Sequence, residues 1–246
     1  MNNMSVDKMK IYELSIRTRE KLGVDRNGAI DIFSLVQNIP HLSLVLYPLS
    51  NEISGMCIKR KNDTIIIINS QMSVGRQNFS IAHELYHYYF DETENTFICN
   101  SDININLETE QEANQFASYL LIPIGELTFK NNEVSIDKII EFEQYYRVSH
   151  QALLYRLLDE GLINHNQMES LKNNITKTAS RLGFDISLYK DSNDKKKYKT
   201  YGYYIKQVQK LQDKDIVSNG KYEQLLLDAF RGDIVYGEDE VIELND

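Results

Sequence analysis

Two histidines and a glutamate form the pattern in this chain that is best able to do chemistry. The segment Ser80-Ile-Ala-His83-Glu84-Leu-Tyr-His87 contains the spacing His-Glu-x-x-His inside an apolar helical pattern. Side chains at positions i and i+4 lie one turn apart on one helix face, so the two imidazoles can hold one metal ion. We therefore expect a zinc site with His83 and His87 as ligands and Glu84 as the catalytic carboxylate. The alternative, two histidines that are exposed or hydrogen-bonded in a core, suits a lone histidine better than this pair.

A catalytic zinc takes three protein ligands and keeps its fourth position for water, so a third ligand must come from elsewhere. The acidic candidates downstream are Asp91, Glu92, Glu94, Asp102, Glu108, Glu110 and Glu112. In a helix over 108–121, Glu110 borders the apolar stripe, where a carboxylate is costly unless a positive group receives it. We expect Glu110 to be the ligand, with Asn114 one turn later hydrogen-bonding a histidine. The alternative for Glu110 is a solvated charge at a helix N-terminus, which the helix dipole favours.

A small sheet and a series of helices must position these residues. Runs rich in Ile, Leu and Val predict strands over 42–47, 53–58 and 64–68, and their short connections favour antiparallel pairing. Apolar periodicity predicts helices over 6–22, 31–38, 77–90, 108–121, 136–146, 149–160, 166–182, 204–211 and 221–230. The fold class expected is α+β: a small antiparallel sheet packed on helices that carry the zinc site, followed by a helical C-terminal region.

Three motifs in order carry a family resemblance. They are Arg76-Gln-Asn-Phe-Ser-Ile-Ala-His83-Glu-Leu-Tyr-His87, Glu110-x-Glu112-Ala-Asn114-x-Phe-Ala-x-x-Leu-Leu-Ile-Pro123 and Val148-Ser-x-x-Ala-Leu-Leu-x-Arg-Leu. This pattern resembles the ImmA/IrrE family of metallo-endopeptidases and is specific over residues 69–162. The resemblance implies a gluzincin-like zinc site with the ligands named above and Glu84 as catalytic carboxylate. Asn114 stands where the broader gluzincin pattern has Asp, so it can hydrogen-bond but cannot supply the same charge.

The resemblance also implies a substrate and a domain organisation. Members of the family typically cleave a helix-turn-helix repressor and so switch on phage, mobile-element or stress genes. We expect a metallopeptidase domain over residues 1–162, with a helix-turn-helix-like segment at about 136–162, and a mainly helical region of unknown role over 163–246. The competing hypothesis is a non-catalytic, metal-stabilised regulatory protein that binds a partner protein or DNA. Glu84 favours the enzyme, because a purely structural zinc site needs no general base.

Charge and composition restrict the partners. The 246-residue chain carries 27 Lys and Arg against 36 Asp and Glu, a formal charge of -9, which argues against a nucleic-acid partner held by non-specific phosphate contacts. Two cysteines are typical of a reduced intracellular protein. A polar N-terminus and a longest aliphatic run of Ile65 to Ile68 predict no membrane segment, so we expect a cytoplasmic protein.

Several residues carry weaker signals. An oxyanion stabiliser is expected, and Tyr145, Tyr146 and His150 are candidates, although packing explains the two tyrosines better and exposure near a helix start explains His150 better. Cys57 and Cys99 lack zinc-site spacing, so we expect apolar packing for both, with Cys99 in a stretch that can be extended. The polar segment 189–204, rich in Lys and Tyr, predicts a linker or exposed loop, and residues 233–246 form an acidic tail.

Overall fold

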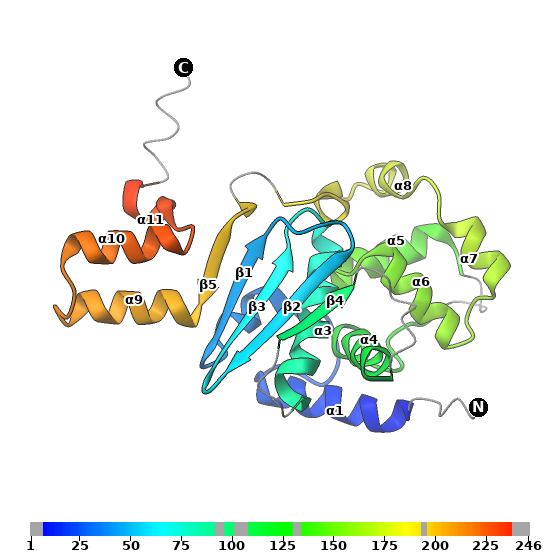
Figure 1. The fold of residues 1–246 in the computed structure, drawn as a ribbon. Helices are drawn as coiled ribbons and strands as arrows, with labels where there is room; N and C mark the ends of the chain where they lie inside the picture. The colour runs from blue at the N-terminus through cyan, green and yellow to red at the C-terminus, as the bar shows by residue number, and fades with distance from the viewer. Residues whose placement is uncertain (1–6, 92–95, 101–107, 130–133, 193–195, 238–246) are drawn as a thin grey trace, which may run out of the picture.

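A mixed five-stranded sheet forms one layer of the protein. The computed structural model describes residues 7–91, 96–100, 108–129, 134–192 and 196–237. The strand order is β4-β2-β3-β1-β5 (Figure 1). The strands are β1 (Leu42–Tyr47), β2 (Ile53–Arg60), β3 (Asp63–Asn69), β4 (Thr96–Asn100) and β5 (Lys199–Gly202). The three predicted strands are therefore present.

The prediction of a wholly antiparallel sheet is wrong at one pairing. Strand β3 pairs antiparallel with β2 but parallel with β1, with Leu44 opposite Ile66. Parallel strands usually need a long crossover connection. Here β2 serves as the crossover. It runs antiparallel to β3 and does not pair with β1, and β3 lies between β1 and β2 in the sheet. Short connections therefore do not force consecutive strands to be neighbours.

Helices account for most of the remaining chain and confirm the mixed α/β class with a helical C-terminal region. They are α1 (Lys8–Lys21), α2 (Ile32–Val36), α3 (Val74–Phe90), α4 (Glu108–Leu121), α5 (Ile136–Tyr146), α6 (His150–Asp159), α7 (His165–Leu171), α8 (Ile175–Arg181), the 3-10 helix η2 (Ile186–Tyr189), α9 (Tyr203–Asp213), α10 (Asn219–Asp228) and α11 (Gly232–Tyr236). Helix α3 contacts β2 and β3 on one side and α4 on the other. The core lies between these layers and includes the fully buried Ile68, Leu85 and Phe116.

Two predictions about the second half of the chain need correction. The helix expected over 166–182 is two helices, α7 and α8, because Asn174 adopts a left-handed backbone conformation (φ 61°) that asparagine tolerates better than most residues. The linker expected over 189–204 contains the edge strand β5, in which Thr200 and Gly202 are buried in alternation with half-buried neighbours. Thr200 lies opposite Val45 of β1, so this polar sequence is held by backbone pairing.

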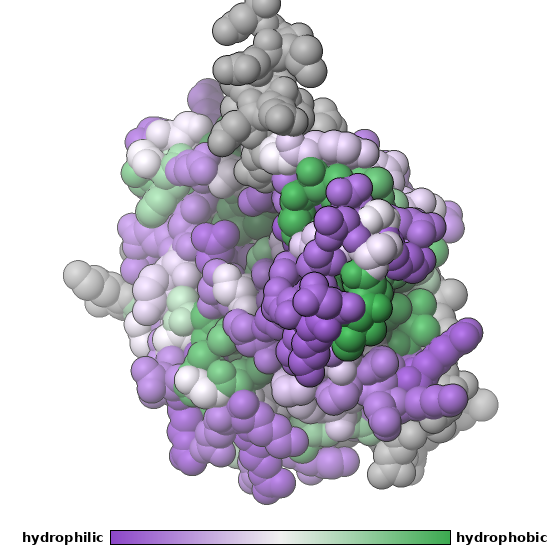
Figure 2. Space-filling view, turned by 90° about the vertical axis from the view of Figure 1, so that its left-hand side faces the viewer, coloured by the Kyte–Doolittle hydropathy of each residue, from purple (hydrophilic) through white to green (hydrophobic). Residues whose placement is uncertain are grey.

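Helices α9, α10 and α11 lie beyond β5, on the side of the sheet away from α3 to α8 (Figure 1). Figure 2 looks onto this side and shows hydrophobic patches between hydrophilic ones. The rings of Tyr47, Tyr198 and Phe230 contact one another there. The acidic tail predicted over 233–246 begins inside helix α11, where Asp233 is paired with Lys199 and Arg231. Residues 238–246 of this tail lie outside the described residues. No helix in the described ranges is long and apolar enough to cross a membrane.

Candidate metal centre

Helix α3 carries the His-Glu-x-x-His motif through the centre of the protein. Ser73 caps its N-terminus by accepting a hydrogen bond from the backbone N–H of Arg76. Gly75 lets α6 approach closely, since a Cβ at this position would stand 2.7 Å from the backbone nitrogen of Ser149. The helix is buried on the histidine side as well as on its apolar side, because α4 packs on it, and His83 and His87 are 6% and 1% exposed.

Three side chains converge with their ligand atoms facing one another. The Nε2 atoms of His83 and His87 are 3.2 Å apart. Glu110, on the first turn of α4, places Oε2 at 3.3 Å from Nε2 of His83 and Oε1 at 3.6 Å from Nε2 of His87. The structure thus brings together the two histidines of the motif and the distant carboxylate expected from periodicity.

The opposite nitrogen of each imidazole has an oxygen partner. Nδ1 of His83 lies 2.9 Å from Oδ1 of Asn114, and Nδ1 of His87 lies 2.6 Å from Oδ2 of Asp91. Because an amide oxygen and a carboxylate accept hydrogen bonds, each Nδ1 is the donor, and the lone pair of each Nε2 points into the cluster. Asn114 has the contact that the sequence predicts. Asp91 was a candidate ligand, but it orients His87 instead.

A fourth side chain, Cys99, joins the same cluster. Its Sγ and one ligand atom from each of His83, His87 and Glu110 all lie within 4.8 Å of one another. Both cysteines are buried, as predicted, but apolar packing alone does not describe Cys99. Its position follows from the pairing of β4 with β2, which places Cys99 opposite Gly55. Nothing in cysteine spacing indicates this contact.

Glu84 is fully buried beside these residues, and neither of its carboxylate oxygens has a hydrogen-bond partner among the described residues. A Cβ on Gly55 would stand 2.7 Å from Oε1 of Glu84, so the missing side chain makes room for this carboxylate. Burial raises the pKa of Glu84 to about 7, and the charge of His83 and the nearby thiol of Cys99 oppose this only in part. A buried carboxylate without a partner costs free energy, which marks it as a functional group.

The charges in the cluster are strongly coupled. Burial lowers the pKa of His87, and the neighbouring His83 lowers it further. Burial also acts to lower the pKa of His83, but the hydrogen bond and charge of Glu110, together with the charge of Glu84, outweigh it and raise this pKa. Burial acts to raise the pKa of Glu110, but the two histidines outweigh it and lower this pKa. Two imidazole nitrogens and a carboxylate in this arrangement fit a divalent cation.

The other acidic candidates lie elsewhere or cannot be placed. Glu112 accepts a hydrogen bond from the hydroxyl of Tyr86, and Glu108 is exposed. Glu92, Glu94 and Asp102 lie outside the described residues.

The three oxyanion candidates have structural contacts of their own. The hydroxyl of Tyr146 donates to Glu126, and Nδ1 of His150 pairs with Glu143. Tyr145 is 59% exposed. The expected packing of Tyr146 is confirmed, but the expectations for the other two residues are wrong. Tyr145 is exposed rather than packed, and His150 is 8% exposed because its imidazole is buried against Glu143.

Comparison with known proteins finds a family match for the segment that holds this cluster. Residues 48–158 match the model of a peptidase family described as the IrrE N-terminal-like domain. This segment is similar to the IrrE N-terminal-like domain. The match confirms the family resemblance seen in the three motifs and supports a metallopeptidase. The IrrE-like segment runs from β2 to α6, so it contains His83, Glu84, His87, Cys99 and Glu110. A search of curated proteins found no match for the chain.

Proposed function

We propose that this protein is a zinc-dependent endopeptidase that hydrolyses a peptide bond in a protein substrate. The observation that carries the proposal is the fully buried carboxylate of Glu84, whose oxygens accept no hydrogen bond of ordinary geometry from the described residues, beside three converging ligand atoms. A metal held only for stability needs no such base. The IrrE-like match of residues 48–158 to a peptidase family supports the same reaction class.

The donor set supports zinc as the metal. His83, His87 and Glu110 would supply two imidazole nitrogens and one carboxylate oxygen, the ligand types common in zinc peptidases. A bound zinc ion polarises a carbonyl and makes a water nucleophilic at neutral pH. Asn114 and Asp91 hold the imidazoles in the tautomer that leaves Nε2 free to coordinate.

Glu84 performs the proton transfers. One carboxylate oxygen takes a proton from the attacking water and returns it to the leaving amide nitrogen when the bond breaks. A pKa raised to about 7 suits both steps, because the group can accept and release a proton near neutral pH. Replacement of Glu84 by Gln should therefore abolish turnover and leave the metal bound.

The substrate we propose is a helix-turn-helix repressor, acted on in the cytoplasm. The support for this substrate is the resemblance to the ImmA/IrrE family, and the chemistry of the metal site does not select a substrate by itself. A net charge of -9 disfavours direct binding to nucleic acid. Two statements about domain organisation stay predictions. One is the boundary at residue 162 between the metallopeptidase domain and the C-terminal region, and the other is the helix-turn-helix-like role of α5 and α6.

The test compares the zinc-loaded protein with its Glu84→Gln variant on a purified repressor encoded beside its gene. We expect a discrete cut, located by mass spectrometry, with the native protein and none with the variant. If both forms bind the repressor and neither cuts it, the competing hypothesis of a metal-stabilised binding protein is the better account.

A further inference from the structure

Cys99 has a thiol at the metal cluster that the proposed reaction does not use. The thiol is free, the residue is 1% exposed, and Sγ lies within 4.8 Å of a ligand atom of each of His83, His87 and Glu110. A second observation concerns the same cluster: both oxygens of Glu84 are buried there without a hydrogen-bond partner in the part of the chain that the structure describes. The cluster thus contains four donor groups and one carboxylate base, one donor more than a catalytic zinc site needs.

The sheet holds Cys99 at this position. Strand β4 is one of the two edge strands, and its pairing with β2 sets Cys99 opposite Gly55, the residue whose missing side chain leaves room for Glu84. The hydroxyl of Ser54 donates to the backbone oxygen of Cys99 at 3.3 Å. The second thiol, Cys57, lies on β2 and is equally buried but is not part of the cluster, so it provides a matched control.

We propose that Cys99 is a fourth protein ligand that closes the metal site in the resting protein. The inference rests on the proposed function and adds a form of regulation to it. Two imidazoles, a carboxylate and a thiolate complete a tetrahedral set and leave no position for water. On coordination the sulfur–metal bond forms and the thiol proton passes to solvent; a bound cation deprotonates even a buried thiol. Displacement of Cys99 opens the position. Because β4 pairs only with β2 among the described strands, it can shift without separating the other strands.

Cobalt(II) reports this ligand directly, because cobalt–thiolate bonds give a charge-transfer absorption that nitrogen and oxygen ligands do not. The full chain, made metal-free, is titrated with Co²⁺ as native protein, Cys99→Ala and Cys57→Ala. We expect the charge-transfer band in the native protein and in Cys57→Ala, and its loss in Cys99→Ala with the visible cobalt bands retained. The dissociation constant of Cys99→Ala should rise by at least about 10-fold.

The outcomes separate this inference from the proposed function. Visible cobalt bands without charge transfer in the native protein, or a charge-transfer band that persists in Cys99→Ala, overturn the thiol ligand and leave the peptidase proposal intact. No cobalt uptake by the native protein overturns both. With saturating zinc, Cys99→Ala should cut the repressor faster than the native protein, and an equal or lower rate overturns the closing role.

Discussion

At the scale of single residues, Gly55 controls where the Glu84 carboxylate can lie. Gly55→Ala would put a Cβ 2.7 Å from Oε1 of Glu84, so the carboxylate must move away. Because a shift of about 1 Å in a catalytic group can cost about 100-fold in rate, we expect kcat/KM to fall by about that factor while the zinc content stays unchanged. The control is Gly220→Ala, where a Cβ meets nothing within 4 Å. Undiminished cleavage by Gly55→Ala would contradict this role.

The pKa of Glu84 predicts how stability depends on pH in the metal-free protein. The folded-state value, about 7, lies above the ordinary value of 4.5, so folding favours the protonated form. This contribution to stability is complete below about pH 4.5 and is lost as the pH rises toward 7. Between pH 5 and pH 8 the free energy of unfolding of the native protein should fall by about 2 kcal/mol relative to Glu84→Gln. Urea unfolding in a chelator measures this, and parallel pH profiles would refute it.

The sequence predicts individual site residues to the extent that helical geometry fixes them. His83 and His87 follow from i and i+4 spacing, and Glu110 and Asn114 share a helix face whose apolar border is readable from periodicity. Cys99 and Gly55 come together only through the pairing of β2 with β4. Local pattern carries no information about such a contact, so the sequence leaves the thiol as an ordinary buried cysteine.

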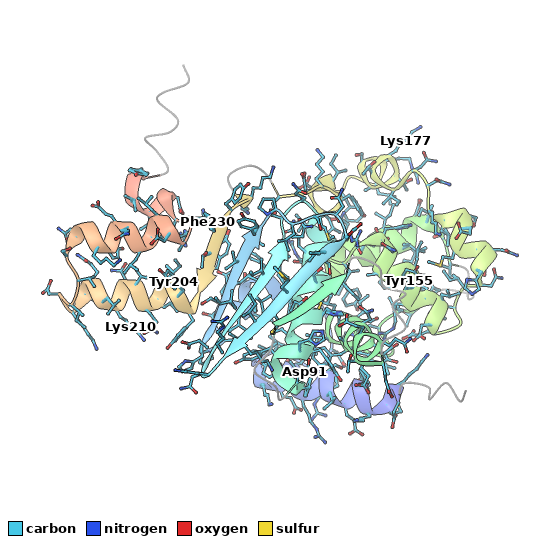
Figure 3. The ribbon with its side chains drawn as sticks, in the orientation of Figure 1. Asp91, Tyr155, Lys177, Tyr204, Lys210 and Phe230 are labelled. Atoms are coloured by element: carbon cyan, nitrogen blue, oxygen red, sulfur yellow. The ribbon has the colours of Figure 1, made fainter. Side chains whose placement is uncertain are left out.

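At the scale of elements, Asp91 links the end of α3 to the site. It is the C-cap residue, its carboxylate lies 2.6 Å from Nδ1 of His87, and its backbone oxygen accepts a hydrogen bond from Lys59 of β2. Figure 3 labels Asp91 among the side chains of this region. Asp91→Ala should raise the zinc dissociation constant by about 10- to 100-fold, because His87 loses the partner that orients it. Competition with a chelating dye measures the change.

A matched control exists on the surface. Asp63 pairs with Nδ1 of His41 at 3.0 Å; both side chains are largely exposed, and neither residue belongs to the metal cluster. Asp63→Ala should leave zinc affinity unchanged. If both variants lose affinity equally, or if Asp91→Ala loses none, Asp91 does not act through His87.

Periodicity predicts helices and strands well where one face of the element is buried. It predicts them poorly where contacts with distant parts of the chain determine the secondary structure or the strand pairing. Helix α4 has the expected bounds, Glu108–Leu121, because its apolar stripe is continuous. Strand β5 reads as a polar linker because Lys199 and Tyr201 are only half buried, and its strand conformation depends on β1. The parallel pairing of β1 with β3 is likewise a property of the assembled sheet.

At the scale of the whole molecule, the C-terminal region completes the sheet. Strand β5 pairs with β1 over Ser43 to Leu46, so a chain ending at residue 198 would expose the edge of β1. Unpaired edges promote association between chains. We expect the 1–198 chain to unfold at lower urea concentration and to self-associate in light scattering, whereas a 1–237 chain should behave like the full chain. Equal stability of the two truncated chains would show that β5 is dispensable.

The central claim is that His83, His87 and Glu110 hold a metal beside the catalytic Glu84, and the metal content of purified variants tests it most directly. Native protein and Glu84→Gln should each retain about one zinc per chain after dialysis, because Glu84 is not a ligand. His83→Ala should lose most of this metal, since an unreplaced imidazole leaves an incomplete site. Zinc retained by His83→Ala at the native level would contradict the account.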